Sequence, residues 1–118
     1  MKKILPLLLF VLLAFAGCQR TPATYQMANN PREMVANAEK FAKQVSKDSK
    51  HYSAEDWQVI EQQFVIMGKN YVENMQHMTE EERMRYDHAR MDFMYAVGKN
   101  GGEELTARIK ADYANIID

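Results

Sequence analysis

The stretch SAEDWQVIEQQFVIMGKNYVENMQHM, residues 53–78, decides the fold of this chain. Its large apolar residues recur at intervals of three and four, the spacing that lines one face of an α-helix. Ser53 is a favoured N-cap, and Glu55 and Asp56 suit the positive end of the helix dipole. We predict one continuous helix over residues 54–78. Its apolar line consists of Trp57, Ile60, Phe64, Met67, Tyr71, Met75 and Met78.

A second group of apolar residues in the same segment indicates that this helix touches two neighbours. Val59 and Ile66 lie nearly opposite the main apolar line, and Val65 and Val72 flank it. A helix with apolar residues on two sides is usually covered on both. We therefore expect this helix at the centre of the domain.

Three further segments have helical periodicity. Asn30 followed by Pro31 is a cap with proline at the first helical position, and Thr79 followed by Glu82 is a capping box. Glycines between 98 and 102 predict a break before the last helix. No long run alternates with period two, so we predict an all-α fold, a small bundle of three long helices plus a shorter C-terminal one. The three further helices are expected over residues 31–47, 80–97 and 103–117.

The N-terminus has the pattern of a bacterial lipoprotein signal peptide. Lys2 and Lys3 precede an apolar run over residues 4–16, and small residues lead up to Cys18. The 13 apolar residues are too few to span a bilayer, which takes about 20. We expect cleavage after Gly17, lipidation of the Cys18 thiol and permanent attachment to the membrane through the acyl chains.

This interpretation divides the chain into a signal peptide (1–17), a lipidated cysteine with a flexible tether (18–29) and a helical domain (30–118). The tether is polar and aperiodic, and its last 11 residues reach at most about 35 Å when extended. Gln19 follows the cysteine where an aspartate would favour inner-membrane retention. We therefore expect an outer-membrane lipoprotein that faces the periplasm.

Composition excludes several classes of function. Removal of residues 1–17 leaves 101 residues with 13 basic and 16 acidic side chains, a net charge of −3, so nucleic acid is not an expected ligand. Once Cys18 is acylated the domain has no thiol for a disulfide, a nucleophile or a metal site. No nucleophile elbow or phosphate-binding loop occurs, and helix capping explains the acidic run at residues 80–82. We expect no enzymatic activity, no cofactor and no small-molecule substrate.

The segment over residues 80–97 has two apolar sides, of which only one can pack on the preceding helix. One side holds two aromatic residues and is the better core; it consists of Tyr86, Ala89, Phe93 and Val97. The other is softer, and methionine-rich faces adapt to varied partners. We expect this second side to be exposed and to contact an envelope protein. It consists of Met84, His88, Met91 and Tyr95.

The same side allows an alternative function. Thioether and imidazole ligands suit Cu(I), and Met84, His88 and Met91 share one face at spacings of four and three. A Cu(I)-binding module is therefore the second hypothesis. No set of residues has the spacing of a zinc site.

Two stretches resemble known families. Tyr52-Ser53-Ala54-Glu55-Asp56-Trp57 and Met78-Thr79-Glu80-Glu81-Glu82 with Tyr86, together with the lipoprotein signal, resemble uncharacterised small helical lipoproteins of Bacteroidetes, a domain of unknown function. That resemblance implies a helical envelope protein and no activity. The second stretch is also similar to the Leu-Thr-x-x-Gln motif of Spy/CpxP-type periplasmic helical chaperones, with Met for Leu and Glu for Gln. This likeness implies a chaperone-like module.

Overall fold

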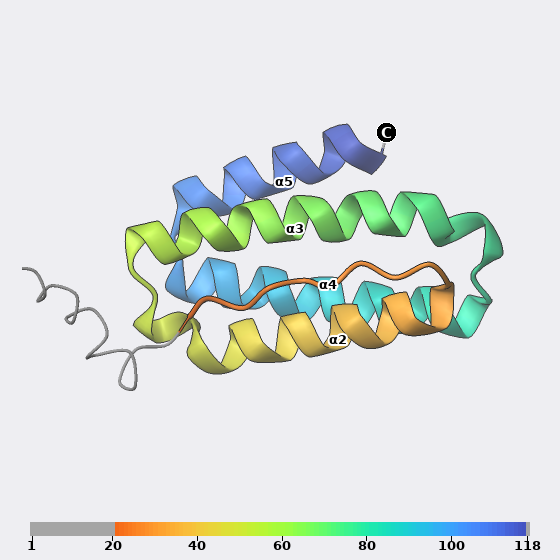
Figure 1. Ribbon diagram of the computed structural model, residues 1–118. Coiled ribbons are helices and arrows are strands. Elements are labelled where there is room, and N and C mark those ends of the chain that lie inside the picture. Colours follow the sequence, from red (N-terminus) through yellow and green to blue (C-terminus); the bar gives the residue numbers. More distant parts are fainter. Residues whose placement is uncertain (1–20, 118) are drawn as a thin grey trace, which may run out of the picture.

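The protein folds as a four-helix bundle over residues 21–117, the part of the chain that the computed structural model describes (Figure 1). Within this range there is no β-strand, which confirms the prediction of an all-α fold with three long helices and a shorter last one. Two short 3-10 turns, η2 (Ser49–His51) and η3 (Met75–His77), follow the first two helices. The helices are α2 (Pro31–Asp48), α3 (Ala54–Asn74), α4 (Glu80–Asn100) and α5 (Glu103–Ile117).

The predicted helix starts are confirmed by their caps. The Asn30 side chain accepts from the Glu33 N–H. At α3 and α4 the capping boxes are complete in both directions, since Ser53 and Thr79 each accept from the third helical residue and donate their own N–H to its carboxylate. Each reciprocal cap satisfies two backbone groups that a helix start leaves open.

Two predicted helix ends are wrong. α3 stops at Asn74, before the expected end at residue 78, and the chain then turns through η3 so that α4 runs back antiparallel to α3 (Figure 1). The carbonyl of Met75 accepts from the Met78 N–H within the turn, at 3.4 Å, and from Arg83 Nη2 at 2.9 Å. α4 continues through Gly98 and ends at Asn100, with Gly101 as its C-cap. The next glycine, Gly102, takes a positive φ of 98° that other residues rarely adopt.

The helices form a ring in which α2 packs on α4, α4 on α5, α5 on α3 and α3 on α2. In this order the closest neighbours, α2 with α4 and α3 with α5, run parallel (Figure 1). α5 approaches α3 at Gly68, where a side chain would lie against Tyr113 and Ile116. Of the second apolar group expected on α3, Ile66 is partly buried, whereas Val59 and Val72 stay exposed.

A continuous series of aromatic rings joins the elements at the centre of the bundle. Phe93 of α4 stacks between Phe41 of α2 and Phe64 of α3, with ring centroids 5.5 and 4.2 Å apart. Tyr113 of α5 stacks on the far side of Phe64 at 5.0 Å, and Tyr25 meets Phe41 edge-on at 6.3 Å. Each pair adds to the burial of apolar surface that holds the fold together.

Residues 21–29, predicted as part of a flexible tether, are instead packed along the bundle. They run extended between α2 and α3, as Figure 1 shows, with Ala23, Tyr25 and Ala28 buried. We call residues 21–29 the strap. The prediction is wrong for the strap because polar composition hid its alternation of buried and exposed side chains. The signal peptide, Cys18 and residues 19–20 lie outside the described residues.

Candidate functional site

The outer side of α4 is the candidate interaction site. Met84, Met91 and Tyr95 are 65%, 59% and 71% exposed, and they lie on one stripe of the helix together with His88, whose side chain is 78% exposed. Contiguous exposed apolar surface on a small domain often marks an interaction site, whereas single exposed apolar residues are common. The prediction that this side of α4 faces outward is confirmed. We call these four residues the α4 stripe.

The opposite side of α4 is the core side, as predicted. Tyr86, Ala89, Phe93 and Val97 are each 3% exposed or less. Their burial holds the helix at one rotation about its axis and leaves the α4 stripe pointing away from the bundle. α4 therefore has two different apolar sides, of which the bundle uses one.

A pair of tyrosine hydroxyl groups holds the buried side in register with α5. The hydroxyls of Tyr86 and Tyr113 are 2.8 Å apart, and the Tyr86 ring stacks on Tyr71 at 4.3 Å. Burial raises the pKa of Tyr113 to about 12 and raises the pKa of Tyr86 further. Both phenols are therefore neutral hydrogen-bonding groups at physiological pH.

Charged groups beside the α4 stripe are mostly engaged within the domain. Arg85 makes a bidentate ion pair with Glu39 of α2, at 2.6 and 2.9 Å, and the hydrogen bond from Arg85 holds the pKa of Glu39 below its usual value. His88 Nδ1 lies 3.7 Å from Asp92 Oδ2. The thioether and phenol groups of the α4 stripe are thus bordered on the α2 side by the paired Arg85 and Glu39.

Metal chemistry at the α4 stripe would depend on Met84, His88 and Met91, which the fold places on the same exposed side. Within residues 21–117 there is no group of three or more His, Asp or Glu side chains arranged to hold a metal ion. The stripe thus offers soft ligands in a solvent-exposed row, without a surrounding cage.

The strap is held by polar residues of α3 that sequence reasoning missed. Asn70 is fully buried; its Oδ1 accepts from the Tyr25 hydroxyl at 2.6 Å and from the Ala28 N–H at 2.9 Å. Gln63 Oε1 accepts from the Tyr25 N–H at 2.7 Å, and Asn74 Nδ2 lies 3.5 Å from the Ala28 carbonyl. The available signal was the spacing of four between Asn70 and Asn74 on a largely apolar helix.

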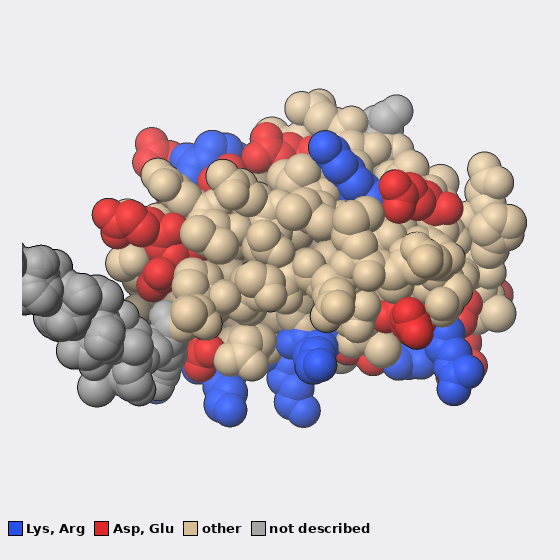
Figure 2. Space-filling view, viewed as in Figure 1, with Lys and Arg blue, Asp and Glu red and all other residues tan. Residues whose placement is uncertain are grey.

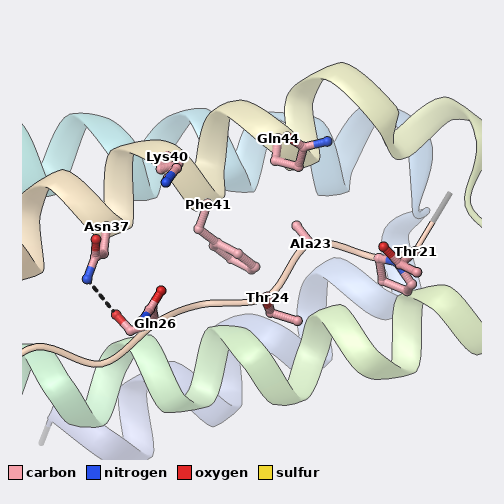
Figure 3. Close-up of a pocket in the computed structure, with 9 residues that line it drawn as sticks. Thr21, Ala23, Thr24, Gln26, Asn37, Lys40, Phe41 and Gln44 are labelled. Atoms are coloured by element: carbon pink, nitrogen blue, oxygen red, sulfur yellow. Dashed lines mark hydrogen bonds between the residues drawn. The ribbon is translucent and has the colours of Figure 1, made fainter.

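A hollow of about 290 Å³ lies between the strap and α2 (Figure 3). Its rim is polar, and one hydrogen bond crosses it, from Asn37 Nδ2 to the Gln26 carbonyl at 2.8 Å. Phe41 forms part of the lining and belongs to the aromatic series of the core. Among the described residues that line the hollow there is no carboxylate and no histidine, and Lys40 brings the one ionisable side chain. Its lining residues are Thr21, Pro22, Ala23, Thr24, Gln26, Asn37, Lys40, Phe41 and Gln44.

Comparison with known proteins adds no assignment: no family model, no curated protein and no solved structure matches this chain. Among residues 21–117 no helix is long and apolar enough to cross a membrane. Function must therefore be inferred from the surface of the domain and from its N-terminal sequence.

Proposed function

We propose that this chain is an outer-membrane lipoprotein, anchored through Cys18 and facing the periplasm, whose domain binds an envelope protein through the α4 stripe. The domain acts without catalysis, as an interaction or chaperone-like module. The observation that carries the proposal is the exposure of Met84, Met91 and Tyr95 in one row on a helix whose other side is fully buried. Because the core is complete without these side chains, their apolar character is not needed for folding.

The chemistry of the α4 stripe indicates the kind of partner. Methionine side chains are flexible and polarisable, and they adapt to differently shaped apolar surfaces. Tyr95 adds a rigid aromatic ring with a hydroxyl group, a combination favoured at interfaces. An amphipathic segment of another protein, with its apolar side towards the stripe, would satisfy both features.

Affinity purification of the full-length protein from native membranes, after reversible crosslinking, tests the interaction. Met91→Glu places a charge in the stripe, and Val72→Glu is the matched control because Val72 is an exposed apolar residue of α3. We expect Val72→Glu to retain the proteins bound by the wild type and Met91→Glu to lose them. Equal recovery from both variants would show that the stripe is not the binding surface. One protein in stoichiometric amount indicates a dedicated partner, whereas many clients indicate a chaperone-like role.

The anchor is tested separately by cell fractionation. Wild-type protein is expected in the outer-membrane fraction, and Cys18→Ala is expected to leave it because the thiol that carries the lipid is gone. A Cys18→Ala protein that stays with the membrane would refute lipid anchoring while leaving the α4 interaction open to the purification test.

The second candidate function is Cu(I) binding by the α4 stripe. It is favoured by one observation, the placement of His88 between Met84 and Met91 on the same exposed side. Titration with Cu(I) under a competing chelator tests it. Micromolar or tighter binding that is lost in Met84→Leu with His88→Ala would support a metal-binding module over a protein-interaction module.

A further inference from the structure

The exposed side of α2 and η2 carries a row of positive charge. The four lysines at positions 40, 43, 47 and 50 follow the helical spacing of three, four and three, and Arg32 extends their line by two turns. All five side chains are exposed. In Figure 2 basic side chains line the lower edge of the molecule, where α2 lies in the same view. We call these residues the basic stripe: Arg32, Lys40, Lys43, Lys47 and Lys50.

Few acidic groups oppose the basic stripe. Of the three acids between residues 31 and 51, Glu39 is bound to Arg85 and Asp48 is buried with a hydrogen bond from Gln44, which leaves Glu33. The segment 31–51 therefore carries five basic and three acidic side chains, whereas the other described residues carry seven and twelve. The domain thus has one basic side although its net charge is negative.

The packed strap places the predicted lipid close to the basic stripe. The described strap begins at Thr21, which lines the same hollow as Gln44 and Lys40 of α2 (Figure 3). Only three peptide units separate Cys18 from Thr21, so their Cα atoms are at most about 11 Å apart. The chain between the predicted lipid at Cys18 and the packed strap is therefore far shorter than an 11-residue flexible tether would be. It joins the strap at Thr21, beside the last turns of α2.

We propose that the basic stripe rests on the anionic phospholipid headgroups of the membrane that carries the Cys18 lipid. The proposal rests on the lipidation in the proposed function. At the end of the bundle where the strap begins, the first turns of α3 and α5 carry acidic residues, and an anionic surface repels them. The bundle therefore tilts towards α2. The acidic residues in those first turns are Glu55, Asp56, Glu103 and Glu104.

The electrostatics of the stripe suit contact with headgroups and not insertion into the hydrocarbon. The other exposed residues of α2 bring no large apolar side chain; they are Glu33, Ala36, Gln44 and Ser46. Salt screens exposed charges beyond about 8 Å, and packed helices lie about 8–10 Å apart, so acidic groups on α3 and α5 weaken the attraction little. On α4, Asp92 lines the same hollow as Lys43 and is the acidic group of that helix that opposes the stripe there. Attraction per basic residue near an anionic leaflet is modest but adds along the row.

Quenching by headgroup-labelled lipids tests this orientation on the full-length lipidated protein in vesicles. Because the Cys18 thiol carries the lipid, a cysteine introduced elsewhere is the only thiol free to take a fluorophore. Ala36→Cys lies within the basic stripe, and Ala107→Cys is the matched exposed position on α5. With nitroxide headgroups in phosphatidylcholine–phosphatidylglycerol vesicles, we expect several-fold stronger quenching at 36 than at 107. The difference should disappear in pure phosphatidylcholine, in high salt, and in Lys43→Gln with Lys47→Gln.

The quenching experiment distinguishes the alternative outcomes from one another. Equal quenching at both positions, in protein that floats with the vesicles, overturns the orientation and leaves the anchor intact. Protein that fails to float refutes both the lipid anchor and the orientation that depends on it. A difference unaffected by anionic lipid would overturn the proposal, because the orientation would then not depend on attraction between the basic stripe and the headgroups. Lys69→Gln with Lys110→Gln, exposed lysines of α3 and α5, should leave the difference unchanged.

Discussion

The side chain of Asn70 pairs with the backbone of Ala28 in both directions. Its Oδ1 accepts from the Ala28 N–H and its Nδ2 donates to the Ala28 carbonyl, each at 2.9 Å. The side-chain amide of Asn70 thus pairs with the backbone N–H and C=O of Ala28, as the backbone of a neighbouring β-strand would. Because buried polar groups are costly when left unpaired, this contact decides whether the strap stays on the bundle.

Removal of the Asn70 amide is expected to release the strap. Asn70→Ala deletes the hydrogen bonds to Tyr25 and Ala28 together, and we expect a loss of about 1–3 kcal/mol in the free energy of unfolding. Hydrogen exchange should show loss of protection at the Tyr25 and Ala28 amides. Asn115→Ala, at an exposed asparagine of α5, is the control. Unchanged protection in Asn70→Ala would mean that other contacts hold the strap.

The two sides of α4 should differ in their sensitivity to truncation. Phe93→Ala removes the ring that stacks between Phe41 and Phe64 and should cost about 3–5 kcal/mol. Met91→Ala, on the exposed side, should change stability by about 0.5 kcal/mol or less. Thermal melting of the two variants gives the comparison. A larger loss from Met91→Ala would mean that α4 is rotated relative to the structure.

Two helical glycines should respond oppositely to alanine. At Gly98 a Cβ would meet nothing within 4 Å, so Gly98→Ala should stabilise the helix by about 0.5–1 kcal/mol. At Gly68 the Cβ would lie 3.1 Å from Tyr113 Cε1, and that ring cannot easily move because it stacks on Phe64 and meets the Tyr86 hydroxyl. Gly68→Ala should therefore lower the melting temperature. If Gly68→Ala raises it as much as Gly98→Ala does, the α3–α5 contact is looser than described.

Stability should fall steeply in alkali. Burial raises the pKa of Tyr113 to about 12 and raises those of Tyr25 and Tyr86 further, whereas unfolded tyrosines ionise near pH 10. Above about pH 10 the unfolded state therefore loses protons that the folded state keeps, so stability is full below that pH and declines as pH rises. Chemical denaturation from pH 8 to 11 measures the free energy of unfolding at each pH, and Tyr86→Phe should flatten its decline. A flat profile in the wild type would contradict the burial of these phenols.

The helix starts and the two sides of α4 were predictable because they depend on local chemistry. Ser53 and Thr79 are caps whose acceptor reaches only three residues along the chain, and an exposed or buried side follows from the periodicity. On α4, two aromatic residues marked the core side before any contact was known, and Phe93 lies at the centre of the aromatic series.

The strap and the α3–α5 contact could not be predicted in the same way, because both depend on residues far apart in the sequence. From the sequence Asn70 has the character of a surface residue. Its burial depends on contacts with Tyr25 and Ala28, which are 45 and 42 positions away. From the sequence Gly68 is only a weak helix former. Its role in the α3–α5 contact depends on Tyr113, whose ring occupies the space beside it. The helical spacing of its lysines places the basic stripe on one side of α2, but its relation to Thr21 required the packed strap.

Site-specific photocrosslinking in native membranes tests most directly the claim that the α4 stripe binds an envelope protein. A photoreactive side chain at Met91 or Tyr95 samples the stripe, and the same group at Val72 or Ala107 samples exposed positions on α3 and α5. The account predicts discrete crosslinked protein from 91 and 95, weakened by Met84→Glu, and none from 72 and 107. Crosslinks of equal yield from all four positions, or none from the stripe, would contradict it.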